Sequence, residues 1–117
     1  MPRHCRLIIP GLSVHLVQRR NNNQPCFHTV EDYQNYLVWL KQYSDESGCA
    51  IHAYALMANH VHLLVTPHKK DSLGNMMKGL NQRYAQYINS TYSRKGKLWN
   101  GRFRSCIVQQ DNYLLSC

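Results

Sequence analysis

The stretch from residue 49 to residue 66 constrains the fold more than any other part of the chain. Residues 49–57 and residues 60–66 both have β character, and only Ala58 and Asn59 separate them. Two strands joined by so short a link form an antiparallel hairpin. Pro67 is expected to close the second strand. The hairpin therefore makes an antiparallel sheet the frame of the domain.

A strand and a helix are predicted before this hairpin. Residues 14–20 read as a strand. Thr29 and Asp32 have the spacing of a capping box, which opens a helix, and Gly48 is the residue type that commonly ends one. Apolar and aromatic residues between them recur at helical spacing, so this helix is expected to lay one face against the sheet.

A helix and a strand are also predicted after the hairpin. Asp71 or Ser72 is expected to cap the helix, whose apolar residues fall on one face. Residues 102–108 are predicted to form the last strand. A further helix is expected to begin at residues 111–112 and to be incomplete at Cys117.

The order strand, helix, hairpin, helix, strand predicts an α+β, ferredoxin-like antiparallel sheet with the helices packed on one face. We expect residues 1–117 to form a single domain, because the chain shows no repeat or linker and its 44% hydrophobic residues suffice for one core. Neither a signal peptide nor a membrane-spanning stretch is found. The five cysteines form no C-x-x-C pair, which favours idle thiols in the cytoplasm over disulfides or a zinc knuckle.

His60 and His62 are the candidate metal ligands. Side chains at positions i and i+2 of a strand point to the same face, so the two imidazoles should stand side by side while Val61 points into the packed face. Two neutral imidazoles that face one spot can hold a divalent metal ion. Such a pair alone is a weak signal, because strands carry it by chance. Surface or satisfied core positions are expected for the other histidines, of which two on predicted strands could be neighbours (His15 and His52): His4, His15, His28, His52 and His68.

The carboxy-terminal half is strongly basic. The chain carries 14 Lys and Arg against 6 Asp and Glu, a formal net charge of +8, which favours nucleic acid over a membrane surface as partner. No acidic residue occurs between Asp71 and Asp111, where basic and aromatic residues are interleaved. This combination predicts binding of single-stranded nucleic acid, with an ordinary solvated basic surface as the alternative. The carboxylates are dispersed, so in a nuclease the imidazoles would have to hold the metal.

Four segments carry a resemblance to a known family. Residues 56–65 surround the histidine pair, residues 6–20 include the first predicted strand, and residues 84–89 lie on the second predicted helix. Residues 97–105 contain Trp, Gly, Arg and Phe at the spacing of a glycine-x-x-tryptophan-x-glycine-arginine-phenylalanine signature. Together, and in their order along the chain, they resemble the single-tyrosine transposases with a His-hydrophobic-His (HUH) motif, and among these the REP-associated tyrosine transposases.

The resemblance implies a fold, a chemistry and a substrate. The sheet would be ferredoxin-like and similar to an RNA-recognition motif. His60 and His62 would hold Mg²⁺ or Mn²⁺ against the scissile phosphate. A tyrosine would attack this phosphate and leave a 5′-phosphotyrosine link and a free 3′-OH, which would make the chain a DNA transposase and endonuclease. The substrate would be single-stranded DNA with a hairpin nearby, no membrane would be involved, and a homodimer is one of the states that the resemblance allows.

The resemblance also bears on the nucleophile. In the family the attacking tyrosine lies on the helix after the last strand, and a third metal ligand often comes from that helix. Residues 111–117 match only the opening of it, so the nucleophile is expected beyond Cys117. Tyr113 is the less favoured alternative, since its other role would be to pack this helix onto the sheet.

The DNA contacts are predicted in the basic half. Trp99 is expected to stack on a base or to wedge the loop, and a place in the core is equally compatible with the sequence. Two other functions stay open: a non-catalytic module that binds single-stranded nucleic acid, and a small basic domain whose histidines are structural. Phosphate contacts are predicted for Arg83, Lys97, Arg102 and Arg104.

Overall fold

The computed structural model describes residues 8–108, so Tyr113 and the helix expected from residues 111–112 lie outside the described residues. The elements follow in this order: β1 (Val14–Arg19), η1 (Asn21–Asn23), α1 (Val30–Ser47), β2 (Cys49–Leu56), β3 (His60–Pro67), α2 (Ser72–Thr91) and β4 (Arg104–Ile107).

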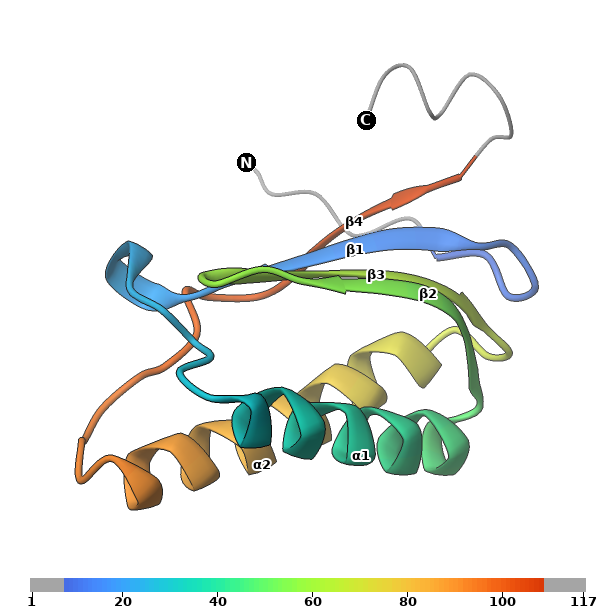
Figure 1. Cartoon of the computed structure of the whole chain (residues 1–117). Helices are drawn as coiled ribbons and strands as arrows, with labels where there is room; N and C mark the ends of the chain where they lie inside the picture. The colour runs from blue at the N-terminus through green and yellow to red at the C-terminus, as the bar shows by residue number, and fades with distance from the viewer. Residues whose placement is uncertain (1–7, 109–117) are drawn as a thin grey trace.

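The four strands form one antiparallel sheet in the order β2-β3-β1-β4. Both α1 and α2 cover the same face of this sheet (Figure 1). The predicted α+β, ferredoxin-like architecture is therefore confirmed. We call the other face, which no helix of the described part of the chain covers, the open face.

The expected hairpin is formed by β2 and β3. Met57 donates a backbone hydrogen bond of 2.8 Å to the carbonyl of His60 and so closes the turn. The register pairs Leu56 with Val61 at this end and Cys49 with Pro67 at the other, with one irregularity near residues 51–53. Because β3 also pairs with β1, the histidine strand lies inside the sheet and not at its edge.

The helix ends follow the predictions in part. Thr29 and Asp32 form the expected capping box of α1, and Gly48 ends this helix in the left-handed conformation, with φ of 77°. Asp71 is the N-cap of α2, but its side chain makes no capping hydrogen bond. The Ser72 hydroxyl instead accepts a hydrogen bond from the backbone N–H of Lys69.

The core lies between the sheet and the helices. Val61 and Leu63 of β3, together with Leu16 of β1, point into it and are at most 1% exposed. The aromatic rings of Tyr36 and Tyr84 meet edge to face at its centre, with 5.2 Å between ring centroids. No helix in the described range is long and apolar enough to span a membrane. In the same range Cys26 and Cys49 are buried free thiols, and Cys106 is exposed.

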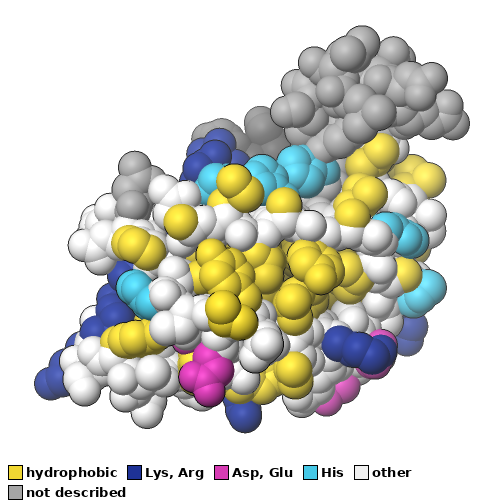
Figure 2. Space-filling model, viewed as in Figure 1, with side chains coloured by type: hydrophobic (Ala, Val, Ile, Leu, Met, Phe, Trp, Pro, Cys, Tyr) yellow, Lys and Arg dark blue, Asp and Glu magenta, His cyan; other side chains and the backbone are white. Residues whose placement is uncertain are grey.

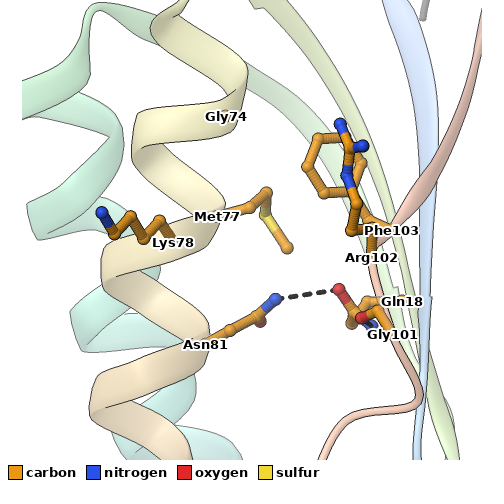
Figure 3. Close-up of a pocket in the computed structure, with 8 residues that line it drawn as sticks. All are labelled: Gln18, Gly74, Met77, Lys78, Asn81, Gly101, Arg102 and Phe103. Carbon is orange, nitrogen blue, oxygen red and sulfur yellow. Dashed lines mark hydrogen bonds between the residues drawn. The ribbon is translucent and has the colours of Figure 1, made fainter. Parts of the chain in front are cut away.

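A polar contact joins β1 to α2 within this apolar layer. The buried Gln18 amide accepts a hydrogen bond of 2.8 Å from Asn81 and donates one of 3.2 Å to the carbonyl of Gly101 (Figure 3). Gly101 has φ of 68°, a conformation that glycine adopts without strain. The segment before β4 is thereby fixed beside the sheet. β4 itself begins at Arg104 and not at residue 102, because its ladder with β1 starts at the pair Val17–Arg104.

Candidate metal site and nucleic-acid surface

His60 and His62 lie on β3, on the open face of the sheet. Their ring centroids are 4.7 Å apart and the rings are nearly perpendicular, with an interplanar angle of 75°. Val61 between them is fully buried against the helices. Strand alternation thus brings the two imidazoles side by side, as their spacing predicts.

The hydrogen bond of His60 leaves one of its ring nitrogens available. Nδ1 of His60 lies 2.7 Å from the Oδ1 atom of Asn59. A carbonyl oxygen only accepts, so Nδ1 carries the proton and Nε2 keeps its lone pair. Partial burial, the neighbouring His62 and Arg19 all lower the pKa of His60, which favours this neutral form near neutral pH.

His62 has a histidine as its neighbour. Nε2 of His15, on β1, lies 2.9 Å from Nδ1 of His62, and the two rings are nearly parallel. Burial and then the charge of His62 lower the pKa of His15. The sequence placed His15 at the surface or in the core, and its proximity to His62 emerges only from the pairing of β1 with β3. His52 instead contacts Thr66 at the edge of the sheet.

The donor set fits a divalent ion that accepts nitrogen ligands. Two neutral imidazoles on one spot are suitable ligands for first-row divalent metals, whereas Mg²⁺ prefers an all-oxygen shell. Within residues 8–108, no three His, Cys, Asp or Glu side chains lie close enough together to hold an ion. The described part of the chain therefore offers two ligands, His60 and His62.

Two exposed arginines share the open face with the histidines. Arg19 lies directly opposite His60 in the β1–β3 register. Val17 has His62 as its partner on one side and Arg104 as its partner on the other. Adjacent strands are about 4.8 Å apart, so the backbones of His62 and Arg104 are about 10 Å apart. Figure 2 shows histidines along this side of the molecule, with Lys or Arg side chains at one end of the row.

The other predicted DNA contacts lie away from the histidines. Arg83, on α2, stacks on the ring of Trp39 at 4.8 Å, on the helical side of the molecule. Lys97 is exposed in the loop that follows α2. Arg102 lines a cavity of about 320 Å³ between α2 and the segment before β4, together with Lys78 (Figure 3). Of the predicted cations only Arg104 reaches the open face, and Arg19 was not among them.

Trp99 is a core residue. Its side chain is only 7% exposed, and its indole N–H donates a hydrogen bond of 3.2 Å to the carbonyl of Asn81. The backbone of Trp99 forms a bridge with Arg20 at the end of β1. These contacts favour the core role over base stacking, because a ring packed on the protein has no free face for a base.

The described tyrosines lie on the helical side. Tyr87 and Tyr92 donate hydrogen bonds of 2.6 and 2.7 Å to the buried carboxylate of Asp32. Burial and this carboxylate raise the pKa of Tyr87, and the hydrogen bond to Asp32 is the main cause that raises the pKa of Tyr92. Tyr54 on β2 is paired with the buried Leu63, which places its side chain on the helical side as well. Between residues 8 and 108, therefore, no tyrosine projects from the strands onto the open face.

The comparisons with known proteins identify a family and a shared fold. The family model of IS200-like transposases matches residues 9–115. A REP-associated tyrosine transposase, solved bound to a REP hairpin, has a TM-score of 0.78 at 16% identity, over 98% of this chain and 67% of that one. A candidate transposase from Deinococcus radiodurans R1 has a TM-score of 0.70 at 18% identity, over 97% of this chain and 92% of that one. No curated protein sequence matches. At these identities the two structures show a shared fold.

Proposed function

The chain belongs to the family of IS200-like transposases, and from that membership we propose that it cuts and rejoins single-stranded DNA on the open face of its sheet. A role in DNA transposition follows from the family itself. The chemistry, the metal and the form of the DNA are the parts that we propose here.

The observation that carries the proposal is the pair of imidazoles on the open face. His60 keeps a free Nε2 lone pair because its Nδ1 atom is bonded to Asn59. With His62 it would hold a divalent cation, for which we favour Mn²⁺ over Mg²⁺ because both ligands are nitrogen. Such a cation would polarise the scissile phosphate and offset the negative charge that builds on it. Arg19 and Arg104 would bind the flanking phosphates.

The reaction would transfer the scissile phosphate to a tyrosine. The tyrosine oxygen forms a bond to phosphorus, the bond from phosphorus to the DNA 3′ oxygen breaks, and the proton given up by the tyrosine is matched by one taken up at the leaving oxygen. The products are a 5′-phosphotyrosine link and a free 3′-OH. We propose that the tyrosine belongs to the polypeptide that follows β4, with a position beyond Cys117 favoured over Tyr113.

We further propose that the DNA carries a hairpin beside the cleavage site. The support is the fold shared with a transposase that was solved with a REP hairpin. A second support is the distribution of cations around two sides of the molecule, since Arg104 lies on the open face and Arg83 on the helical side.

A Mn²⁺ titration tests the metal site. The wild-type chain should bind one Mn²⁺, and the double variant His60→Ala with His62→Ala should lose this binding. His52→Ala is the matched control, because His52 is an exposed histidine of the neighbouring strand whose side chain hydrogen-bonds to Thr66. Equal Mn²⁺ binding by the double variant would show that the imidazoles are not the ligands.

Incubation with hairpin-containing single-stranded DNA and Mn²⁺ tests the position of the nucleophile. A covalent protein–DNA adduct, detected on a denaturing gel, requires a tyrosine within reach of the histidines. If the nucleophile follows Cys117, residues 1–117 form no adduct. An adduct that disappears in Tyr113→Phe would assign the role to Tyr113.

A second function is a module that binds single-stranded DNA without cutting it. The observation that favours it is the helical-side placement of every tyrosine between residues 8 and 108. This function predicts DNA binding that survives the double histidine substitution, with no adduct in a polypeptide extended past Cys117. Adduct formation by that extended polypeptide would exclude it.

A further inference from the structure

The contact between His15 and His62 has the geometry of a good hydrogen bond. The two facing nitrogens, Nε2 of His15 and Nδ1 of His62, are 2.9 Å apart, while the ring centroids are 5.1 Å apart. The rings therefore meet through these nitrogens, edge to edge. The interplanar angle of only 7° keeps the N–H of one ring close to the lone-pair direction of the other.

One proton lies in this bond when both rings are neutral, and its position decides what His62 can do. If His62 donates through Nδ1, its Nε2 atom has a free lone pair. If His15 donates through Nε2, His62 must carry its own proton on Nε2 and has no lone pair there. Only the first arrangement lets His62 act as a ligand on the side turned away from His15.

His60 shows what the matching arrangement looks like. Asn59 accepts from its Nδ1 atom at 2.7 Å and so keeps Nε2 free. A shared ion is bound by two imidazoles most simply when both present the same free atom. Hydrogen bonds to the other ring nitrogen are the usual way in which proteins fix the tautomer and the orientation of a metal-binding histidine.

We propose that His15 is a positioning residue that accepts the Nδ1 proton of His62 and thereby holds Nε2 of His62 free as a metal ligand. The inference rests on the proposed function of the histidine pair and adds to it a residue on another strand. His15 and His62 are 47 positions apart in the sequence. The antiparallel pairing of β1 with β3 brings them together, with Val17 directly opposite His62.

His15 is not proposed as a third ligand. Its Nε2 atom already faces His62, and it would have to give up this bond to reach an ion. No set of three His, Cys, Asp or Glu side chains among residues 8–108, His15 included, is placed to hold an ion. If His15 acts as the hydrogen-bond partner of His62, on the side of His62 that is turned away from the ion, the observed contact stays intact.

Two substitutions at His15 distinguish its role as a hydrogen-bond acceptor from the space that its ring fills. His15→Phe keeps a flat ring of similar size but removes the acceptor, and His15→Gln restores an acceptor oxygen. In ¹⁵N-detected NMR of the metal-free chain, His62 should carry its proton on Nδ1 in the wild type and in His15→Gln. In His15→Phe the proton should move to Nε2. This measurement needs neither metal nor DNA, so it tests His15 even if catalysis is absent.

Mn²⁺ affinity, measured by electron paramagnetic resonance, gives the second readout. His15→Phe should weaken Mn²⁺ binding about 10- to 100-fold, the usual effect of removing a partner behind a ligand, and His15→Gln should recover most of it. His52→Phe should bind as the wild type does. Thermal unfolding of each variant checks that it is folded under the conditions in which its Mn²⁺ affinity is measured.

The outcomes separate this inference from the proposed function. If the wild type binds Mn²⁺ through His60 and His62 but His15→Phe binds it equally well and His62 keeps its tautomer, His15 has no positioning role and the metal site stands. If the wild type binds no Mn²⁺, the metal site is wrong and with it the role of His15. Weak binding in His15→Phe without recovery in His15→Gln, and with an unchanged tautomer, would also overturn the inference.

Discussion

At the scale of single residues, Arg19 and Arg104 test whether the open face is the DNA surface. Both are exposed, and both flank the histidines through strand pairing. Arg104→Ala and Arg19→Ala should each weaken binding of single-stranded DNA about fivefold, roughly 1 kcal/mol, as expected for one exposed charge contact. Fluorescence anisotropy with a labelled oligonucleotide measures this change.

The control for these two variants is Lys41→Ala. Lys41 is an exposed cation of α1 that pairs with Asp45 on the helical side, so this variant also removes one positive charge. Its effect on DNA binding should be within twofold of the wild type. Equal losses in all three variants would mean that the DNA responds to the net charge of the protein and not to contacts on the open face.

Asp32 gives a prediction about stability and pH. Its carboxylate is fully buried and accepts hydrogen bonds from Tyr87, Tyr92 and the backbone N–H groups of His28 and Thr29. Burial alone would raise the pKa of Asp32, but these hydrogen bonds outweigh burial and lower it. Asp32→Asn places an N–H₂ group among these donors, so the free energy of unfolding at neutral pH should fall by about 1–3 kcal/mol.

The same carboxylate sets the pH range of this contribution. Since its pKa in the folded protein is below the ordinary value of 3.8, the contribution is complete at neutral pH and is lost as the pH falls from that value through the folded pKa. The difference in the free energy of unfolding between wild type and Asp32→Asn, measured by urea unfolding, should therefore decrease as the pH is lowered. Asp45→Asn, at an exposed position, should have almost the same free energy of unfolding as the wild type at every pH. If the difference in the free energy of unfolding between wild type and Asp32→Asn stayed constant with pH, the Asp32 carboxyl would have the same pKa in the folded and the unfolded protein.

The sequence allowed only some of these residues to be predicted. His60 and His62 are two positions apart on one strand, so alternation alone places them together. His15 and Arg19 reach the same site through the register of β1 against β3, which a local pattern does not contain. Trp99 is a residue type suited to stacking on a DNA base, yet its indole N–H donates a hydrogen bond in the core. Residue type therefore predicted chemistry better than it predicted placement.

At the scale of elements, the contact between α1 and α2 depends on one glycine. A Cβ atom on Gly79 would lie 2.6 Å from the Cδ1 and Cε1 atoms of Tyr43, whereas one on Gly74 would meet nothing within 4 Å. Alanine is the better helix former at both positions of α2 by about 1 kcal/mol. Gly74→Ala should therefore raise the free energy of unfolding by up to about 1 kcal/mol. Gly79→Ala should lower it, because overpacking costs about 1–3 kcal/mol.

Urea unfolding of the two variants provides the comparison, and each is the control of the other because they lie on the same helix. The expected order of stability is Gly74→Ala, wild type, Gly79→Ala. Equal gains in both variants would show that the half-buried Tyr43 ring moves aside freely and that α1 and α2 do not need the close approach at residue 79.

The elements themselves were largely predictable where their signals are local. The capping box at Thr29 and the glycine at residue 48 define both ends of α1, and the short link at residues 58–59 defines the hairpin. The short segment Asn21–Asn23 forms a 3-10 turn in which Asn22 has φ of 62°, a conformation that asparagine adopts more readily than most residues. β4 is shorter than predicted because its ladder with β1 starts only at Arg104, and the pairing of strands that are distant in the sequence is not contained in a local pattern.

At the scale of the whole molecule, the carboxylates of the described residues are confined to the helical layer. The acidic residues in the described range all lie on α1 or at the start of α2, and none lies on a strand. Among residues 8–108, the open face therefore carries histidine and arginine without a carboxylate to neutralise them. Such a distribution draws a polyanion to the sheet and turns the acidic helix away from it.

This division of charge predicts a steep dependence of DNA binding on salt. Each neutralised phosphate of a single strand contributes about −0.7 to the slope of log K against log salt. About five contacts would lower the affinity about 100-fold between 50 and 200 mM salt. Arg104→Ala should reduce the slope by about 0.7, and Lys41→Ala should leave it unchanged, because Arg104 lies on the open face and Lys41 lies on α1. A flat salt dependence would exclude phosphate contacts as the source of binding, and an equal change of slope in both variants would mean that the DNA also contacts α1 around Lys41.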